Sequence, residues 1–141
     1  MEYRKDDFLI TTDKEKIDTD YVHRFLRNSY WAQDIPLESV NKRIQGALCF
    51  SVFHLDQQIG FARVISDEAS FAYLADVFID ENFRGRGLSK WLMETIMSYP
   101  TLQNLRRFML ATRDAHGLYE KFGFRAIQNT ERWMEIRSNK L

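Results

Sequence analysis

The chain has 141 residues, is 45% hydrophobic, and carries 20 basic and 20 acidic side chains. A chain of this length and hydrophobicity can bury a substantial core, so disorder is excluded and one domain over residues 1–141 is expected. The net charge is zero, whereas nucleic-acid-binding proteins carry a surplus of basic residues with which they displace phosphate counterions. The single cysteine, Cys49, excludes an internal disulfide or a multi-cysteine metal site and fits a reducing compartment.

The N-terminal residues 1–13 are charged and lack the apolar stretch of a signal peptide. The apolar runs elsewhere are far shorter than the roughly 20 residues that a membrane-spanning helix needs. We therefore expect a cytoplasmic protein that has no membrane or nucleic-acid partner.

In the first third of the chain, residues 8–12 are predicted to form a short strand. Apolar side chains at three- and four-residue spacing then predict a helix over 18–30, capped by Asp18 or Thr19. A second helix is expected to begin near Pro36, because proline is tolerated in the first helical turn.

The middle of the chain reads as three strands, at 48–55, 59–65 and 71–79. They are rich in aromatic and β-branched residues and are joined by short polar turns, which predicts an antiparallel meander. The clearest helical stripe follows at 88–99 and ends before Pro100.

The last third is predicted to contain a strand at 108–112, a helix at 114–122 and a final strand at 132–136. Asp114 is the expected N-cap of this helix, and Gly123 is the expected residue after its end. The order of elements favours an α/β fold with a mixed, mostly antiparallel sheet flanked by helices.

One junction is a candidate ligand-binding site: the predicted strand 71–79 is followed by a short loop with Gly85 and Gly87 and then by the predicted helix 88–99. Glycines at this place allow the backbone to approach a ligand closely. The free N–H groups and the dipole of a helix start favour an anion. The loop lacks the G-x-x-x-x-G-K-[ST] pattern of a P-loop, so that class is excluded.

The charges around this junction strengthen the anion-binding hypothesis. Arg84, Arg86 and Lys90 crowd a helix start that would itself prefer acidic residues. The arrangement is unfavourable unless an anion binds there. The alternative is that Asp80, Glu81 or Glu94 neutralises these cations at the surface.

Two segments resemble motifs of the GNAT superfamily of N-acetyltransferases. Arg84-Gly85-Arg86-Gly87-Leu88-Ser89 is similar to the family's acetyl-CoA pyrophosphate loop, [QR]-x-x-G-x-[GA], with Ser89 where glycine or alanine is usual. Residues 115–124, AHGLYEKFGF, are similar to the family's A-x-x-L-Y-E-K-x-G-F segment. One helix and one strand separate the two motifs, as in that family. The resemblance implies a GNAT-like acyl-CoA N-acyltransferase fold and acetyl-CoA as co-substrate.

The resemblance also implies roles for residues of both motifs. The strand residues Val77, Phe78 and Ile79 would bind the acetyl and pantetheine arm through their main chain, with the Val77 N–H polarising the thioester carbonyl. The amides of the loop 84–89 would hold the pyrophosphate. Tyr119 matches the tyrosine that protonates the departing thiolate; alternatively, its ring packs beside the cofactor without transferring a proton.

Residues after the first helix stand where such proteins build the acceptor pocket. Tyr30 and Trp31 would line it and Asp34 would attract an ammonium group. The alternative is that Tyr30 and Trp31, with Phe25, simply fill the core.

The general base is left open between Asp76, His116 and water. Strand alternation turns the Asp76 side chain away from that of Val77. His116 lies three residues before Tyr119 on a similar helix face, and its imidazole has a suitable pKa for proton transfer.

The remaining residues of chemical interest indicate no metal site. His23 and His54 lack acidic or cysteine partners at ligand spacing, and Cys49 is expected to pack as a small hydrophobe. The sequence therefore predicts transfer of an acetyl group to a primary amine of a small molecule or peptide. A non-catalytic acyl-CoA-binding regulatory or interaction domain is the alternative, and the last strand could pair in a homodimer.

Overall fold

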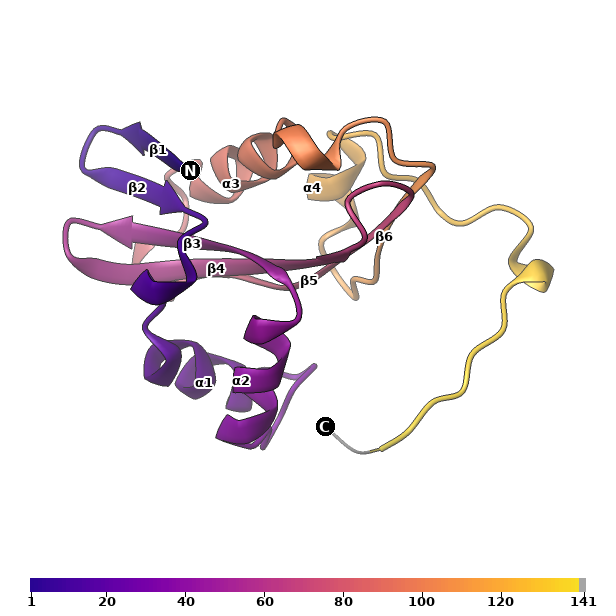
Figure 1. Ribbon diagram of the computed structural model, residues 1–141, viewed down its shortest axis with the longest axis horizontal. Helices are drawn as coiled ribbons and strands as arrows, with labels where there is room; N and C mark the ends of the chain where they lie inside the picture. Colours follow the sequence, from indigo (N-terminus) through magenta and orange to yellow (C-terminus); the bar gives the residue numbers. More distant parts are fainter. Residues whose placement is uncertain (140–141) are drawn as a thin grey trace.

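A computed structural model describes residues 1–139 and shows a sheet of six strands, arranged side by side in chain order (Figure 1). The strands are β1 (Glu2–Lys5), β2 (Phe8–Thr11), β3 (Leu48–His54), β4 (Gln57–Ser66), β5 (Phe71–Ile79) and β6 (Arg107–Leu110). Neighbours from β1 to β5 are antiparallel, whereas β6 is parallel to β5. The predicted α/β class and the mixed, mostly antiparallel sheet are confirmed.

Helices cover both faces of this sheet (Figure 1). On one face lie α1 (Thr19–Arg27) and α2 (Leu37–Gln45), and on the other lie α3 (Leu88–Met97) and α4 (His116–Glu120). Short 3₁₀ turns span Lys14–Lys16, Glu81–Phe83, Pro100–Leu102 and Thr130–Arg132. Two apolar cores result, one beneath each helical layer. Strand β4 contributes to both, which explains its nearly continuous run of buried side chains.

Most helices and strands predicted from the hydrophobic pattern are present, and the differences lie mainly at their ends. Helix α1 ends at Arg27 and not at residue 30, because the chain turns there through Ser29, whose hydroxyl donates to the Leu26 carbonyl. Asp18 caps α1 as predicted, accepting the Tyr21 N–H at 3.1 Å. Strand β1 was missed because its side chains are mostly charged and exposed, as befits an edge strand.

The expected cap of the fourth helix is wrong. Ala115 occupies the N-cap position of α4, and its own N–H donates to the Thr112 hydroxyl at 3.0 Å. Asp114 is instead exposed and lies 3.7 Å from the guanidinium of its neighbour Arg113. Gly123 follows the helix with a φ of 95°, as expected for a residue that ends a helix in the left-handed region.

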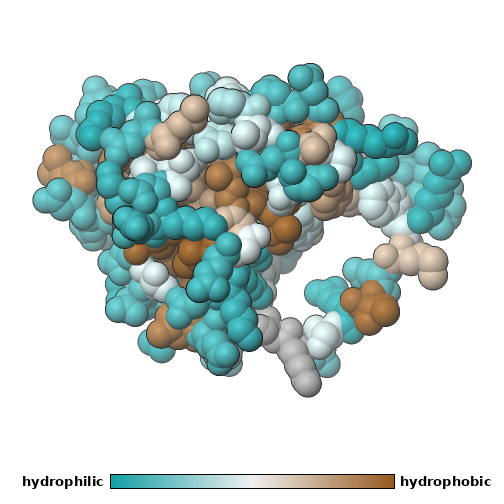
Figure 2. All heavy atoms as spheres, viewed as in Figure 1, coloured by the Kyte–Doolittle hydropathy of each residue, from teal (hydrophilic) through white to brown (hydrophobic). Residues whose placement is uncertain are grey.

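The predicted final strand at 132–136 is also wrong. Residues 125–139 are all exposed and belong to no strand. In Figure 1 this tail loops out from the body of the protein and curves back, and it touches the body where the Arg107 guanidinium lies 4.5 Å from the Trp133 ring. Met134 and Ile136 are 96% and 103% exposed. The alternating pattern of the segment suits a strand, but a strand needs a second strand beside it, and no strand pairing of the described residues includes this tail. Figure 2 shows hydrophobic side chains on the tail, apart from the main body.

Candidate active site

Strands β5 and β6 pair along only part of their length. The pairing runs from Phe71 opposite Arg107 to Leu74 opposite Leu110, where β6 ends. Strand β5 continues to Ile79. Residues 75–79 therefore have no strand beside them on the β6 side, within the part of the chain described.

The hydrogen bonds to β4 show which main-chain groups face this opening. The Asp80 N–H donates to the Ile59 carbonyl on the β4 side at 2.6 Å. Main-chain groups alternate in direction along a strand, so those of Val77 and Ile79 face the opening while those of Phe78 face β4. The Ile79 carbonyl accepts the Arg84 Nε–H at 3.2 Å. The Phe78 ring stacks on Phe25 at 3.7 Å between centroids, in the core under α1.

The loop after β5 depends on glycine for its backbone conformation. Gly85 and Gly87 have φ values of 79° and 76°, and Gly87 directly precedes α3. A Cβ at either position would meet no atom within 4 Å. The glycines are therefore required by the left-handed conformation rather than by lack of space, and the loop surface stays open to a ligand.

The start of α3 has no cap from its own chain. Its first hydrogen bond joins the Trp91 N–H to the Gly87 carbonyl at 3.0 Å, so the N–H groups of residues 88–90 are unused by the helix. The first turn has no acidic residue and Gly87 has no capping side chain. Arg86 lies over the Phe83 ring at 5.1 Å. These groups together favour an anion at the helix start.

The proposed neutralisation of these cations by Asp80 does not occur. The Asp80 carboxylate accepts the Tyr21 hydroxyl at 3.2 Å and the Asn82 N–H at 3.0 Å. Among residues 1–139, Arg86 and Lys90 form no ion pair. The positive charge at this end of α3 is thus left for another partner.

Tyr119 of α4 lies at the opening between β5 and β6 and is 8% exposed. Burial raises the pKa of its hydroxyl above the ordinary value, and the nearby Tyr30 raises it further. The phenol therefore remains protonated at neutral pH. A protonated hydroxyl at this place can donate a proton to a group bound along β5.

A cavity of about 580 Å³ occupies the opening, at the place where the sequence predicts the acceptor pocket, and is called the acceptor cleft after that prediction. It is lined by Tyr30 and Trp31, by residues 73–77 and 110–115, and by Arg43, Arg63, Tyr119 and Arg137. Tyr30 and Trp31 are 51% and 38% exposed, so the alternative that they fill the core is wrong. Asp34, expected beside them, is exposed and does not line this cleft.

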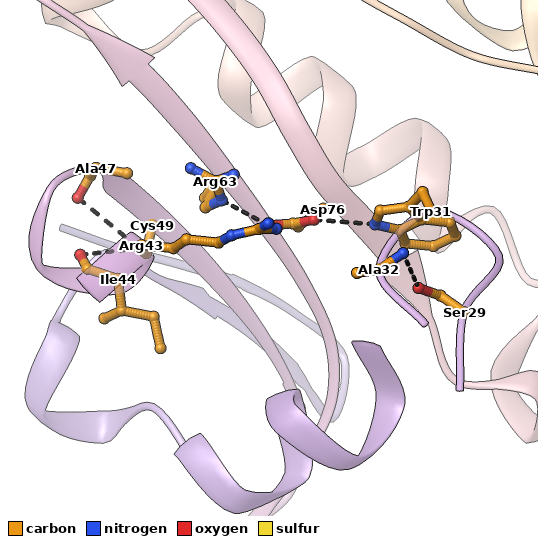
Figure 3. A network of polar contacts seen from close by, with 9 residues as sticks. All are labelled: Ser29, Trp31, Ala32, Arg43, Ile44, Ala47, Cys49, Arg63 and Asp76. Atoms are coloured by element: carbon orange, nitrogen blue, oxygen red, sulfur yellow. Dashed lines mark hydrogen bonds and ion pairs between the residues drawn. The ribbon is translucent and has the colours of Figure 1, made fainter. Parts of the chain in front are cut away.

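Asp76 sits at the wall of the acceptor cleft in a network that the sequence did not reveal (Figure 3). It is 6% exposed, and a bulge in β5 gives it a φ of 53°. Its carboxylate accepts Arg63 Nε at 2.5 Å, Arg43 Nη1 at 3.4 Å and Trp31 Nε1 at 2.9 Å. Two guanidinium groups and the Trp31 indole occupy the oxygens of this carboxylate, so the geometry suits positioning Trp31 better than accepting a proton.

His116 is exposed and does not line the acceptor cleft. It lines a second cavity of about 630 Å³ on the outer side of β6, together with Tyr119. The structure thus brings Tyr30, Trp31, Asp76, Val77 and Tyr119 together but leaves His116 apart from all of them except Tyr119.

His23, His54 and Cys49 pack or hydrogen-bond within the fold and lie outside the acceptor cleft. His23 Nε2 lies 2.9 Å from the Ile35 carbonyl oxygen, and His54 packs between the rings of Phe8 and Phe83. Cys49 is 1% exposed, and burial raises the pKa of its thiol to about 11. Cys49 is therefore a buried apolar residue, as predicted.

Comparisons with known proteins agree with this geometry. The family described as "Acetyltransferase (GNAT) domain" matches residues 45–126. A structure of a GNAT-family protein from Xanthomonas campestris pv. campestris is 47% identical, with a TM-score of 0.92 over 95% of each chain. A protein of Gibberella zeae, described as an acetyltransferase, is 26% identical over 84% of this chain and 79% of its own length. An acetyltransferase of Clostridium acetobutylicum, solved with acetyl-CoA, shares the fold at 15% identity and a TM-score of 0.63, over 92% of this chain and 94% of that one.

The chain belongs to the GNAT family of acetyltransferases. The family's fold binds acetyl-CoA, and the open edge of β5 with the uncapped start of α3 is suited to that molecule. No helix within the described residues is long and apolar enough to cross a membrane.

Proposed function

We propose that the protein transfers an acetyl group from acetyl-CoA to a primary amine, with a small molecule favoured over a peptide as acceptor. The amine attacks directly while both substrates are bound. The observation that carries this proposal is the sequence of two open surfaces: the unpaired edge of β5 is followed, after the short loop 80–87, by the unused amides at the start of α3.

The main chain supplies the contacts to the thioester substrate. The loop amides from Arg84 to Ser89 hold the pyrophosphate, and the helix dipole of α3 adds to their attraction. The Ser89 side chain is half-buried and small, so it does not obstruct this approach. The main-chain groups of Val77 and the N–H of Ile79 bind the acyl and pantetheine arm in the manner of a neighbouring strand, while the Ile79 carbonyl holds Arg84.

Val77 and Tyr119 each assist one part of the chemical step. The Val77 N–H stabilises the negative charge that develops on the thioester oxygen as the amine nitrogen bonds to the carbonyl carbon. Tyr119 donates its proton to the sulfur as the carbon–sulfur bond breaks. Water removes the proton of the attacking amine, because Asp76 is occupied by its arginines and His116 lies outside the acceptor cleft.

The test is the release of free thiol from acetyl-CoA in the presence of a panel of primary amines. We expect turnover in the wild type and a roughly 10²-fold lower kcat in Tyr119→Phe, because only the proton donor is lost. Cofactor affinity, measured by calorimetry, should stay unchanged in that variant. Tight cofactor binding with no turnover on any amine would instead indicate a non-catalytic acyl-CoA-binding domain.

A further inference from the structure

The acceptor cleft is basic, although the whole chain has no net charge. Four arginines line it (Arg43, Arg63, Arg113 and Arg137), against two carboxylates (Asp76 and Asp114). Asp114 is paired with Arg113 at the surface, at 3.7 Å with both side chains about two-thirds exposed. The interior of the cleft therefore has more positive than negative charge.

The surplus is located at the Asp76 network. Arg63 donates to Asp76 through Nε, and Arg43 donates through Nη1. Among the described residues, no other partner is found for either guanidinium. The Arg63 side chain is 11% exposed and the Arg43 side chain 27% exposed, so water screens this charge only in part. One carboxylate thus faces two cations, and both of these arginines line the cleft.

The reacting groups lie along the same wall. Val77 follows Asp76 in the chain, and Tyr119 also lines the cleft. At the rim, Arg113 lies over the Tyr30 ring at 3.7 Å. An acceptor of small size can therefore reach the thioester with its amine while another part of it contacts the guanidinium groups.

We propose that the acceptor carries an anionic group, a carboxylate or a phosphate, besides its amine. This inference rests on the proposed function. The free N–H groups of Arg43 and Arg63 bind the anion, since guanidinium groups match the geometry of both carboxylate and phosphate. The amine is then placed beside Val77 and Tyr119.

The experiment compares amines that differ only in charge. L-amino acids are assayed against their primary amides, and phosphoethanolamine against ethanolamine, by both thiol release and calorimetry on the CoA-bound protein. We expect a kcat/KM at least ~10-fold higher for one of the anionic amines than for its neutral partner. Arg43→Gln should remove that advantage by raising KM for the anionic amine by a much larger factor than KM for its neutral partner. Arg43→Lys, which keeps the charge, should retain part of it.

The outcomes separate this inference from the proposed function. Equal turnover of acids and amides would overturn the anionic acceptor and leave the acetyltransferase proposal standing. Selective, Arg43-dependent binding of an anionic amine without turnover would support the acceptor class and count against catalysis. A decrease in Arg43→Gln that is the same for charged and neutral amines would show a structural role only.

Discussion

Helices α1 and α3 begin in opposite ways, although both start just after a tight turn. The α1 start is completed by its own chain: Asp18 accepts the Tyr21 N–H, and Asp20 supplies a negative charge in the first turn. The α3 start has Gly87 in place of a cap, no acid in its first turn, and arginines nearby. The first arrangement serves the stability of the helix, whereas the second leaves the same chemical groups free for a ligand.

The comparison of α1 with α3 shows that the stabilisation of a helix start and its availability to a ligand exclude each other. A side-chain cap at α3 would stabilise the helix by about 1 kcal/mol, yet it would occupy the amides that are proposed to hold the pyrophosphate. Three changes test this comparison: an acidic cap added to α3, a cation removed from the start of α3, and the cap removed from α1.

The largest effect is expected from Gly87→Asp, which gives α3 an acidic cap. Acetyl-CoA affinity should fall by at least ~100-fold, because a carboxylate then lies beside the phosphates and competes for their amides. Calorimetry measures this loss, and thermal unfolding should show that the variant remains folded. Gly87→Asn, of similar size but neutral, should lose clearly less affinity. Equal affinity of wild type and Gly87→Asp would contradict the assignment of the loop.

An intermediate effect is expected from Arg86→Gln. The side chain is exposed at the loop and adds attraction for a phosphate, so the Kd for acetyl-CoA should rise by roughly 3–10-fold at low salt. The difference should shrink at high ionic strength. Arg106→Gln, at an exposed position away from this loop, is the control and should bind as the wild type does. A salt-independent loss would point to disturbed loop structure.

The smallest effect on binding is expected from Asp18→Ala. Loss of the cap should lower the free energy of unfolding by about 1 kcal/mol, measured by denaturant titration, and leave acetyl-CoA affinity unchanged. Asp18→Asn keeps a side-chain oxygen acceptor and should recover most of the stability. If Asp18→Ala weakened cofactor binding as well, the two helix starts would not be independent.

The fold was largely predictable because its signals are local. The meander strands, the stripe of α3 and the Asp18 cap each depend on residues close together in the chain. The glycine loop was found for the same reason, since its left-handed positions at Gly85 and Gly87 leave a mark in the sequence.

What escaped prediction depends on contacts across long stretches of chain. Arg43 and Arg63 meet Asp76 only because α2, β4 and the bulge of β5 converge, and no short motif contains them. The tail failed for a related reason: its alternation specifies a strand but cannot specify which edge, or which chain, supplies the neighbour. Tyr30 and Trp31 are large aromatic residues of the kind that fill cores, and only the structure shows that they line the acceptor cleft.

The depth of Cys49 has a practical consequence for work on this enzyme. A buried sulfhydryl whose pKa is raised to about 11 is almost wholly protonated at neutral pH, so disulfide reagents and maleimides react with it slowly. Colorimetric detection of released coenzyme A will then carry little background from the native polypeptide. A cysteine engineered at the surface can likewise bear a fluorophore at one defined position without first removing the natural one.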